Sequence, residues 1–333
     1  MAASLVGGAW PIGPGGGQIQ TLKEVKCDRN QGHANFLTPA EITREHLPPG
    51  YQNDPFVNIV KLKCADTVLL QIVQKSPDRP LNFGGAPDSP QKHGGSGTVF
   101  TADMQANQTC PDPNCSYDNN TQHQITGAFR VATTTATVYD DFEARHTNIW
   151  FFFDEEGYTC CIKGVGVKVV AVDYVNKVSI MECRSHCLFL FDKLQRIRFT
   201  KETFLRQLSP SLLFRTLPDH SIGELLPIMT CHPHGKSKRV IVGALRAMSK
   251  LGTDPGTQMA ICNFTYAIPT CRGCNGASVA LYNVVGYCVG FFIHVGFSTN
   301  LGRPTNDRDK TGLGWILEDY VPKRSNAISN EKQ

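Results

Sequence analysis

Short runs rich in β-branched and aromatic residues, separated by Gly, Pro, Asp and Ser, recur along most of this chain. They include residues 56–62, 67–73, 97–100, 127–137, 148–153, 158–172, 228–230, 239–242, 260–264, 278–281 and 284–292. Many short strands separated by turn signals are typical of a β-sandwich or β-barrel, and not of alternating strands and helices. The sequence therefore predicts an all-β fold.

One segment departs from this pattern. Residues 188–208 place Leu190, Leu194, Ile197 and Phe204 near the spacing of one face of a helix. We predict a single long helix there, between the earlier and the later group of strands.

Composition excludes several classes of partner. The chain has 333 residues, 41% of them hydrophobic, and a formal net charge of +4. The apolar fraction is enough for a packed core, and so small a charge, without a basic stripe, argues against nucleic acid. No apolar run reaches the length of about 18 residues that a membrane-spanning helix needs, so we expect no membrane partner.

The start of the chain and its cysteines bear on localisation. Residues 1–20 lack the basic start and apolar core of a secretory signal. Thirteen cysteines, an odd number, then favour reduced thiols. We expect an intracellular, cytoplasmic protein, with residues 1–50 as a mostly disordered Gly/Pro-rich tail, 51–303 as the folded domain and 304–333 as a C-terminal tail.

The most informative motif is a glycine-flanked turn at residues 270–281, which read TCRGCNGASVAL. Strand-like runs follow this turn as far as residue 296. Glycines on either side of a residue let the backbone fold so that successive N–H groups point at one place. Such a group of donors is an oxyanion hole, here expected from the backbone of Gly273 and Asn275.

With this turn, the chain resembles the trypsin-like serine peptidases of the chymotrypsin fold (peptidase S1, PA clan). The family pattern Gly-x-Ser-Gly-(Gly/Ala)-Pro lies on residues 273–278. Segments 95–100, 131–139, 183–190 and 231–235 resemble further family segments in the family's order. The resemblance implies two antiparallel six-stranded β-barrels, at about 54–173 and 227–302, bridged by one helix and separated by a cleft.

The residues at the catalytic positions depart from the family. Peptide hydrolysis needs a nucleophile, an imidazole base and an orienting carboxylate. Read through the resemblance, these positions hold Asn275, Ala136 and Cys187. An amide cannot be deprotonated near neutral pH, and a methyl group cannot accept a proton. The resemblance therefore implies a degenerate, intracellular-type member, a pseudopeptidase that binds a peptide or protein through the cleft.

Two other functions stay open at this point. An active endopeptidase could use Cys274 as a fallback nucleophile, with His146 or His186 as its base. Alternatively, the chain is a β-rich interaction module, unrelated to peptidases, in which the Gly-Cys-Asn-Gly turn is coincidental.

Metal binding is the remaining class. A structural zinc site uses four ligands, commonly two close pairs. Cys110 and Cys115, in a Pro/Asn-rich loop, are weak candidates, and Cys271 with Cys274 has the right spacing but lies in the glycine turn. His232 and His234 are also ligand types. No complete set emerges from spacing alone, so no metal or other cofactor is predicted.

Overall fold

Six antiparallel strands close into a barrel in the first half of the chain. The computed structural model describes residues 27, 33, 35–80, 93–109, 124–156, 161–208, 225–255, 258–283, 288–297 and 309–316. The strands, paired in the order β1-β2-β3-β6-β5-β4, are β1 (Thr67–Ile72), β2 (His93–Thr109), β3 (Gln124–Thr134), β4 (Thr147–Phe151), β5 (Ile162–Asp173) and β6 (Val178–Ser185). Alternate residues such as Val68, Leu70 and Ile72 enter the core with Phe129 and Met181.

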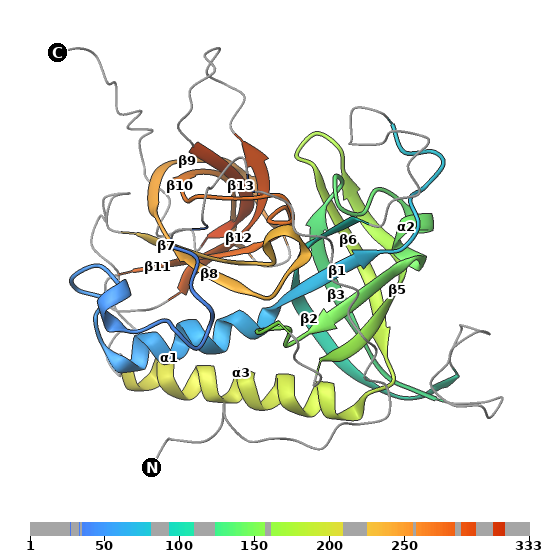
Figure 1. Ribbon diagram of the computed structural model, residues 1–333, viewed down its shortest axis with the longest axis horizontal. Helices are drawn as coiled ribbons and strands as arrows, with labels where there is room; N and C mark the ends of the chain where they lie inside the picture. The colour runs from blue at the N-terminus through green and yellow to red at the C-terminus, as the bar shows by residue number, and fades with distance from the viewer. Residues whose placement is uncertain are drawn as a thin grey trace.

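The second half forms a curled sheet of seven strands. Their order is β8-β7-β11-β12-β13-β10-β9, with β7 (Leu226–Cys231), β8 (Arg239–Val242), β9 (Ala244–Thr253), β10 (Ala260–Ala267), β11 (Ser278–Tyr282), β12 (Cys288–Phe297) and β13 (Asp309–Ile316). Met229, Phe264, Tyr266, Val279 and Phe292 fill its interior. Figure 1 shows the two curled sheets side by side. The all-β architecture with two curled units is confirmed, but the second unit, called the second barrel below, is an open half-barrel of seven strands and not a closed barrel of six.

Three boundaries differ from the sequence prediction. The first barrel runs over 67–185, because β6 pairs with both β3 and β5. The second sheet extends to residue 316, because β13, in the expected C-terminal tail, pairs with β10 and β12. In the expected N-terminal tail, the described residues from 35 onward pack against the second barrel, where Ile42 and Leu47 are buried.

The first helix, α1 (Asp54–Lys63), lies where the sequence predicts a strand at 56–62. Asn53 caps it by accepting a hydrogen bond from the Phe56 N–H (2.9 Å), and Pro55 occupies its first turn. The apolar residues Phe56, Ile59 and Val60 fall at helical spacing and are buried together. The strand prediction was wrong because the β-branched composition outweighed a cap and a proline that mark a helix start.

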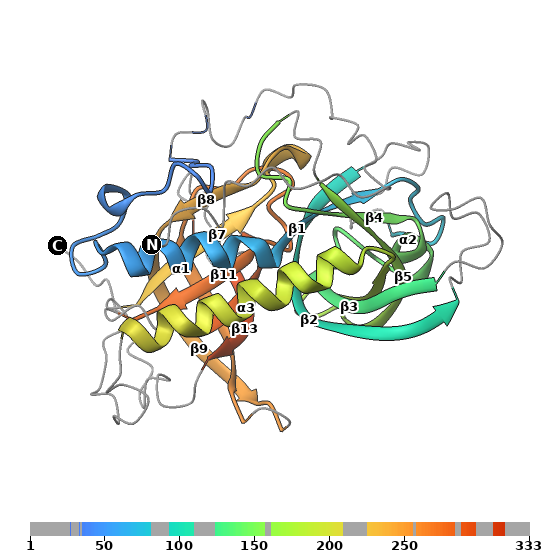
Figure 2. The same ribbon diagram turned by 90° about the horizontal axis from the view of Figure 1, so that it is seen from below.

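The long helix α3 (Leu188–Leu208) confirms the predicted range. Leu190 and Phe191 pack into the core of the first barrel, and Phe204 packs on the cluster that α1 shares with the second sheet. Lys201 also reaches Asp66, with a Nζ–Oδ2 distance of 3.1 Å. Figure 2 shows α1 and α3 side by side, with α3 running across both sheets and α1 along the second. None of the described helices has the length and apolar character needed to cross a membrane.

The two barrels meet through apolar and polar contacts. Ala132 and Val178 of the first barrel pack against Ile293 and Leu313 of the second. Beside them the Thr67 hydroxyl donates to the Thr230 carbonyl (3.5 Å). This boundary brings the start of β2 and the end of β3 up to the glycine turn of the second barrel.

Candidate functional site

The glycine-flanked turn, residues 271–277, is tightly hydrogen-bonded. The Cys274 N–H donates to Cys271 O (3.2 Å), and the Ala277 N–H donates to Cys274 O (2.9 Å). Gly273 and Gly276 have φ values of +87° and +81°. A Cβ atom on Gly276 would also overlap Ser96 O and Thr133 Oγ1. The backbone conformation and the close approach of the first barrel therefore both call for glycine here.

Residues of the first barrel donate hydrogen bonds to the backbone carbonyls of this turn. The Ser96 N–H donates to Asn275 O (3.0 Å) and the Ser96 hydroxyl to Gly273 O (2.8 Å). The Thr98 hydroxyl donates to Gly276 O (3.3 Å). Within the described part of the chain, the N–H groups of Gly273 and Asn275 donate to no other residue. Both residues are half-buried, so the turn can offer two amide donors to a ligand.

Ala136 lies in the turn that follows β3, close to the glycine turn. The Thr133 hydroxyl, three residues earlier, donates to Ser96 O (2.8 Å), and Thr133 also borders Gly276. The structure therefore brings Ala136 and Asn275 to the same part of the barrel boundary. Neither side chain can take up or release a proton near neutral pH.

A buried ion pair holds the Ala136 turn. Arg79 donates to the carbonyls of Ala136 (3.1 Å) and Thr137 (3.3 Å), and its Nη2 lies 2.5 Å from Glu143 Oε2. Burial opposes ionisation of Glu143, but the hydrogen bonds and charge of Arg79 outweigh it and lower the pKa of the carboxyl group. Glu143 remains ionised and keeps Arg79 in place.

Cys187 does not lie near Ala136, so the expected acid position is wrong. In the β3–β6 ladder Thr134 pairs with Val178, and Gly127 pairs with Ser185. Seven residues of strand separate the two pairs, about 24 Å, and Cys187 comes two residues after Ser185. The residue that does adjoin the Ala136 turn is Lys177, whose carbonyl accepts from the Thr135 N–H (3.0 Å). A lysine has no acceptor with which to orient an imidazole.

Cys274 points into the second barrel. Its side chain is fully buried, and its Sγ lies 3.4 Å from Cys231 Sγ. Cys231 is also fully buried, and both thiols belong to the packed core of the second barrel. A buried thiol is a poor nucleophile because burial disfavours its thiolate.

The two histidines proposed as bases for Cys274 lie on the first barrel. The ring of His146 contacts its own helix α2 (Asp141–Arg145), with Nδ1 2.7 Å from Phe142 O. His186 follows Ser185, at the far end of the β3–β6 ladder from Ala136. The structure does not bring either into a described contact with Cys274.

Two other histidines flank the turn, and both are buried. Burial and then the charge of Lys238 lower the pKa of His232 to about 3, so this ring is neutral. Its Nδ1 lies 2.9 Å from Lys236 O. His294 Nδ1 lies 2.7 Å from the Tyr266 hydroxyl. The Tyr266–His294 pair lies inside the second barrel, whereas the ring of His232 stacks on Phe153, with ring centroids 6.2 Å apart.

A cavity of about 250 Å³ opens elsewhere, between α3 and β2. Asp66, Phe100 and Arg198 are among its lining residues. It lies beneath α3, and neither Ala136 nor any residue of the glycine turn lines it.

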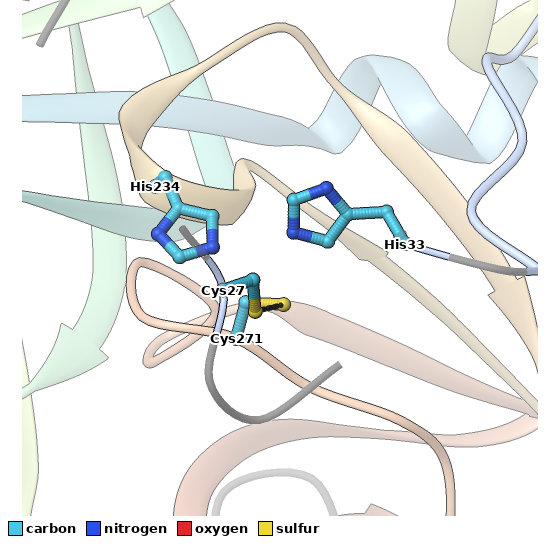
Figure 3. A group of neighbouring side chains, drawn as sticks. All are labelled: Cys27, His33, His234 and Cys271. Atoms are coloured by element: carbon cyan, nitrogen blue, oxygen red, sulfur yellow. Dashed lines mark hydrogen bonds between the residues drawn. The ribbon is translucent and has the colours of Figure 1, made fainter. Parts of the chain in front are cut away.

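Four ligand-type side chains meet on the second-barrel side of the glycine turn. They are Cys27, His33, His234 and Cys271, whose ligand atoms all lie within 4.8 Å of one another (Figure 3). Cys110 and Cys115 lie outside the described residues. Spacing along the sequence instead groups Cys271 with Cys274 and His232 with His234. It gives no signal for this cluster, because Cys27 and His33 lie in the segment interpreted as a tail.

Comparisons with known proteins add little. No protein-family model matches the chain, and no curated protein matches it. Among solved structures, the Rv3671c protease from M. tuberculosis in its active form is 14% identical, covers 78% of each chain and has a TM-score of 0.37. Its inactive form is 14% identical over 78% of this chain and 86% of that one, with a TM-score of 0.35. The HtrA-type protease AlgW with a decapeptide is 13% identical over 79% of this chain and 62% of that one, with a TM-score of 0.34. Values this low leave the activity of the present chain open.

Two features call for glycine at position 276, its positive φ and the close approach of the first barrel, and mutations can separate their contributions to stability. Gly50 has a φ of +92° but no heavy atom within 4 Å of a Cβ position. Gly50→Ala should cost about 1 kcal/mol of unfolding free energy, from φ alone. Gly276→Ala should cost about 2–4 kcal/mol, because it adds the overlap with the first barrel. Equal losses in urea unfolding would mean that the barrels do not meet at this turn.

The Arg79–Glu143 pair predicts how the free energy of unfolding depends on pH. Glu143→Gln should cost about 3–5 kcal/mol at pH 7, because it leaves Arg79 buried without a counter-charge. Since the folded pKa of Glu143 is lowered, its contribution is complete above the usual carboxyl pKa of about 4.3 and is lost as the pH falls further. The variant should therefore lose less stability than the wild type between pH 5 and pH 3.

Glu182→Gln is the matched control for this measurement. Glu182 forms a partly exposed pair with Arg184 at 3.2 Å, so its loss should cost less than about 1 kcal/mol. If Glu143→Gln behaved like Glu182→Gln in urea unfolding, the buried pair would not hold the Ala136 turn.

Proposed function

We propose that this chain is a trypsin-like serine peptidase homologue that has lost its catalysis and binds a peptide or protein beside the glycine turn. One observation supports the proposal: Ser96 donates to Asn275 O and accepts from Thr133, three residues before Ala136, at the boundary of the two barrels. The nucleophile and base positions inferred from the family pattern therefore lie in the same part of this boundary, but hold an amide and a methyl group. Neither can perform the proton transfer that acyl transfer requires.

The third catalytic position also lacks a suitable residue. We assign it to Lys177, because the Lys177 backbone adjoins the turn of Ala136. A cation there would oppose the positive charge that a catalytic imidazole acquires during the reaction. All three positions are therefore unsuited to a triad.

The turn still presents backbone donors that could bind a peptide. The N–H groups of Gly273 and Asn275 can donate to a carbonyl oxygen of a bound peptide, as an oxyanion hole does. Beside Lys177, the loop between β5 and β6 exposes two apolar side chains, Tyr174 (49% exposed) and Val175 (89% exposed). A peptide bound at the turn would be able to place an apolar side chain against this loop.

The burial of Cys274 argues against a cysteine-based endopeptidase. No observation on the described residues favours an interaction module unrelated to peptidases.

None of the described cysteines forms a disulfide, which supports an intracellular compartment that keeps thiols reduced.

If catalysis has been lost, the protein should cleave no peptide substrate. The purified full-length chain should leave casein and fluorogenic peptides intact, because an oxyanion hole and binding alone give only about 10³–10⁴-fold acceleration over water. It should also fail to react with fluorophosphonate and epoxide probes. Cleavage inhibited by a thiol probe, together with labelling that Cys274→Ser abolishes, would overturn the proposal.

Restoring the triad tests the residue assignments. The triple variant Ala136→His, Lys177→Asp, Asn275→Ser should become reactive toward the fluorophosphonate probe at position 275. The matched control carries Cys187→Asp in place of Lys177→Asp, and should stay unreactive because position 187 follows the far end of the β3–β6 ladder. Equal labelling of the two would contradict the assignment of Lys177.

The binding part predicts selective loss of peptide binding. On an array of unstructured peptides, the wild type should select sequences with an apolar residue, and Val175→Asp should weaken the selected peptides about tenfold or more, because it puts a charge in the apolar contact. Leu251→Asp is the control, since Leu251 is 51% exposed on β9. If Leu251→Asp lost the same peptides to the same extent, the β5–β6 loop would not be the binding surface.

A further inference from the structure

The side chains of Cys27, His33, His234 and Cys271 converge from three separate segments. Figure 3 shows the two imidazole rings and the two thiols directed toward a common point. Their ligand atoms lie within 4.8 Å of one another. A tetrahedral zinc ion with Zn–N and Zn–S bonds of about 2.1 and 2.3 Å requires ligand separations of about 3.3–3.8 Å. Small rotations of these side chains would reach that geometry.

Backbone contacts place the ligands independently of any metal. The N–H of His234 donates to Arg272 O (2.5 Å), which ties the loop of His234 to that of Cys271. Leu37 pairs with Val240 in both directions, at 3.1 and 2.7 Å. This bridge brings the segment of His33 to the edge of β8, close to His234. The rings of His33 and His234 are 5.2 Å apart.

One ring nitrogen of His33 is buried at this point without a partner. The Nε2 atom of His33 has no hydrogen-bond partner among the described residues. A buried imidazole nitrogen without a partner is costly, and a metal ion would satisfy it.

A disulfide explains less of this arrangement. The Sγ atoms of Cys27 and Cys271 are 3.0 Å apart, and no disulfide joins them. A disulfide would account for the two thiols but not for two histidines directed at the same point. Two thiolates and two imidazoles are a ligand set that zinc prefers.

We propose that these four residues bind one zinc ion, which fastens the N-terminal segment to the second barrel. Binding forms two Zn–S and two Zn–N bonds, and releases the two thiol protons to solvent. With four protein ligands the site is closed, so the metal is structural and does not activate water. It joins cysteines 244 residues apart in the sequence.

The test uses the full-length chain, purified under reducing conditions without chelator. Elemental analysis should find one equivalent of zinc per chain. Cobalt(II) in place of zinc should give thiolate charge-transfer and tetrahedral d–d absorption bands. Cys27→Ser and His33→Ala should each weaken zinc affinity at least about 100-fold in competition with a chromophoric chelator. Both positions lie outside the β-strands, so these variants should keep the circular dichroism of the wild type.

Two matched controls carry the same chemical changes elsewhere. Cys187→Ser and His186→Ala alter half-buried residues at the end of the first barrel, and should keep the full zinc content. In the wild type, removing zinc should speed hydrogen exchange at the amides of Leu37 and Val240, while strands of the first barrel stay protected.

Three results would overturn the proposal. One is a wild-type chain that, given zinc under reducing conditions, takes up less than a fifth of an equivalent. Another is a Cys27→Ser variant that binds zinc as tightly as the wild type. The last is a Cys27–Cys271 disulfide, found by peptide mass spectrometry, in protein prepared under reducing conditions. None of these results depends on whether the chain cleaves or binds peptides.

Discussion

The docking of the glycine turn on Ser96 is the interaction on which the arrangement of the site depends. Ser96 uses its N–H and its hydroxyl to bind the carbonyls of Asn275 and Gly273, and its hydroxyl also accepts from the His232 N–H (2.8 Å). One residue of the first barrel thereby contacts two loops of the second. Because the carbonyls of the turn face the first barrel, its amides at Gly273 and Asn275 remain for a ligand. Such a contact between barrels requires that the opposing backbone come very close, which only glycine at 276 allows.

This dependence means that the conformation of the turn does not require catalytic side chains. The contacts that shape the turn are made by backbone groups and by Ser96, Thr98 and Thr133. The side chain of Asn275 takes no part in these contacts, and neither does the methyl group of Ala136. Replacing a nucleophile or a base at these positions therefore leaves the fold intact, because chemistry and architecture use different atoms.

Local signals predicted the parts of the structure that local interactions determine. The helical spacing of Leu190, Leu194 and Ile197 located α3, and the glycines located the turn. The assignment of Cys187 failed because it depended on strand register, which joins residues far apart in the sequence and has no local signature. The same limit hid the cluster of Cys27, His33, His234 and Cys271. At 56–62, by contrast, a local signal was present in Asn53 and Pro55 but was outweighed by β-branched composition.

The proposed zinc ion and Ser96 would both fix the glycine turn, the zinc ion through Cys271 on the second-barrel side and Ser96 on the first-barrel side. Cys271 lies four residues before Asn275, and His234 is bound through its N–H to Arg272 O. A metal bonded to both side chains would fix the entry of the turn relative to β7 and β8, while Ser96 fixes its centre relative to β2. Ligation also connects Cys27, and so makes the conformation of the turn depend on the N-terminal segment. Peptide binding at Gly273 and Asn275 would then be coupled to the metal through a few residues of continuous backbone.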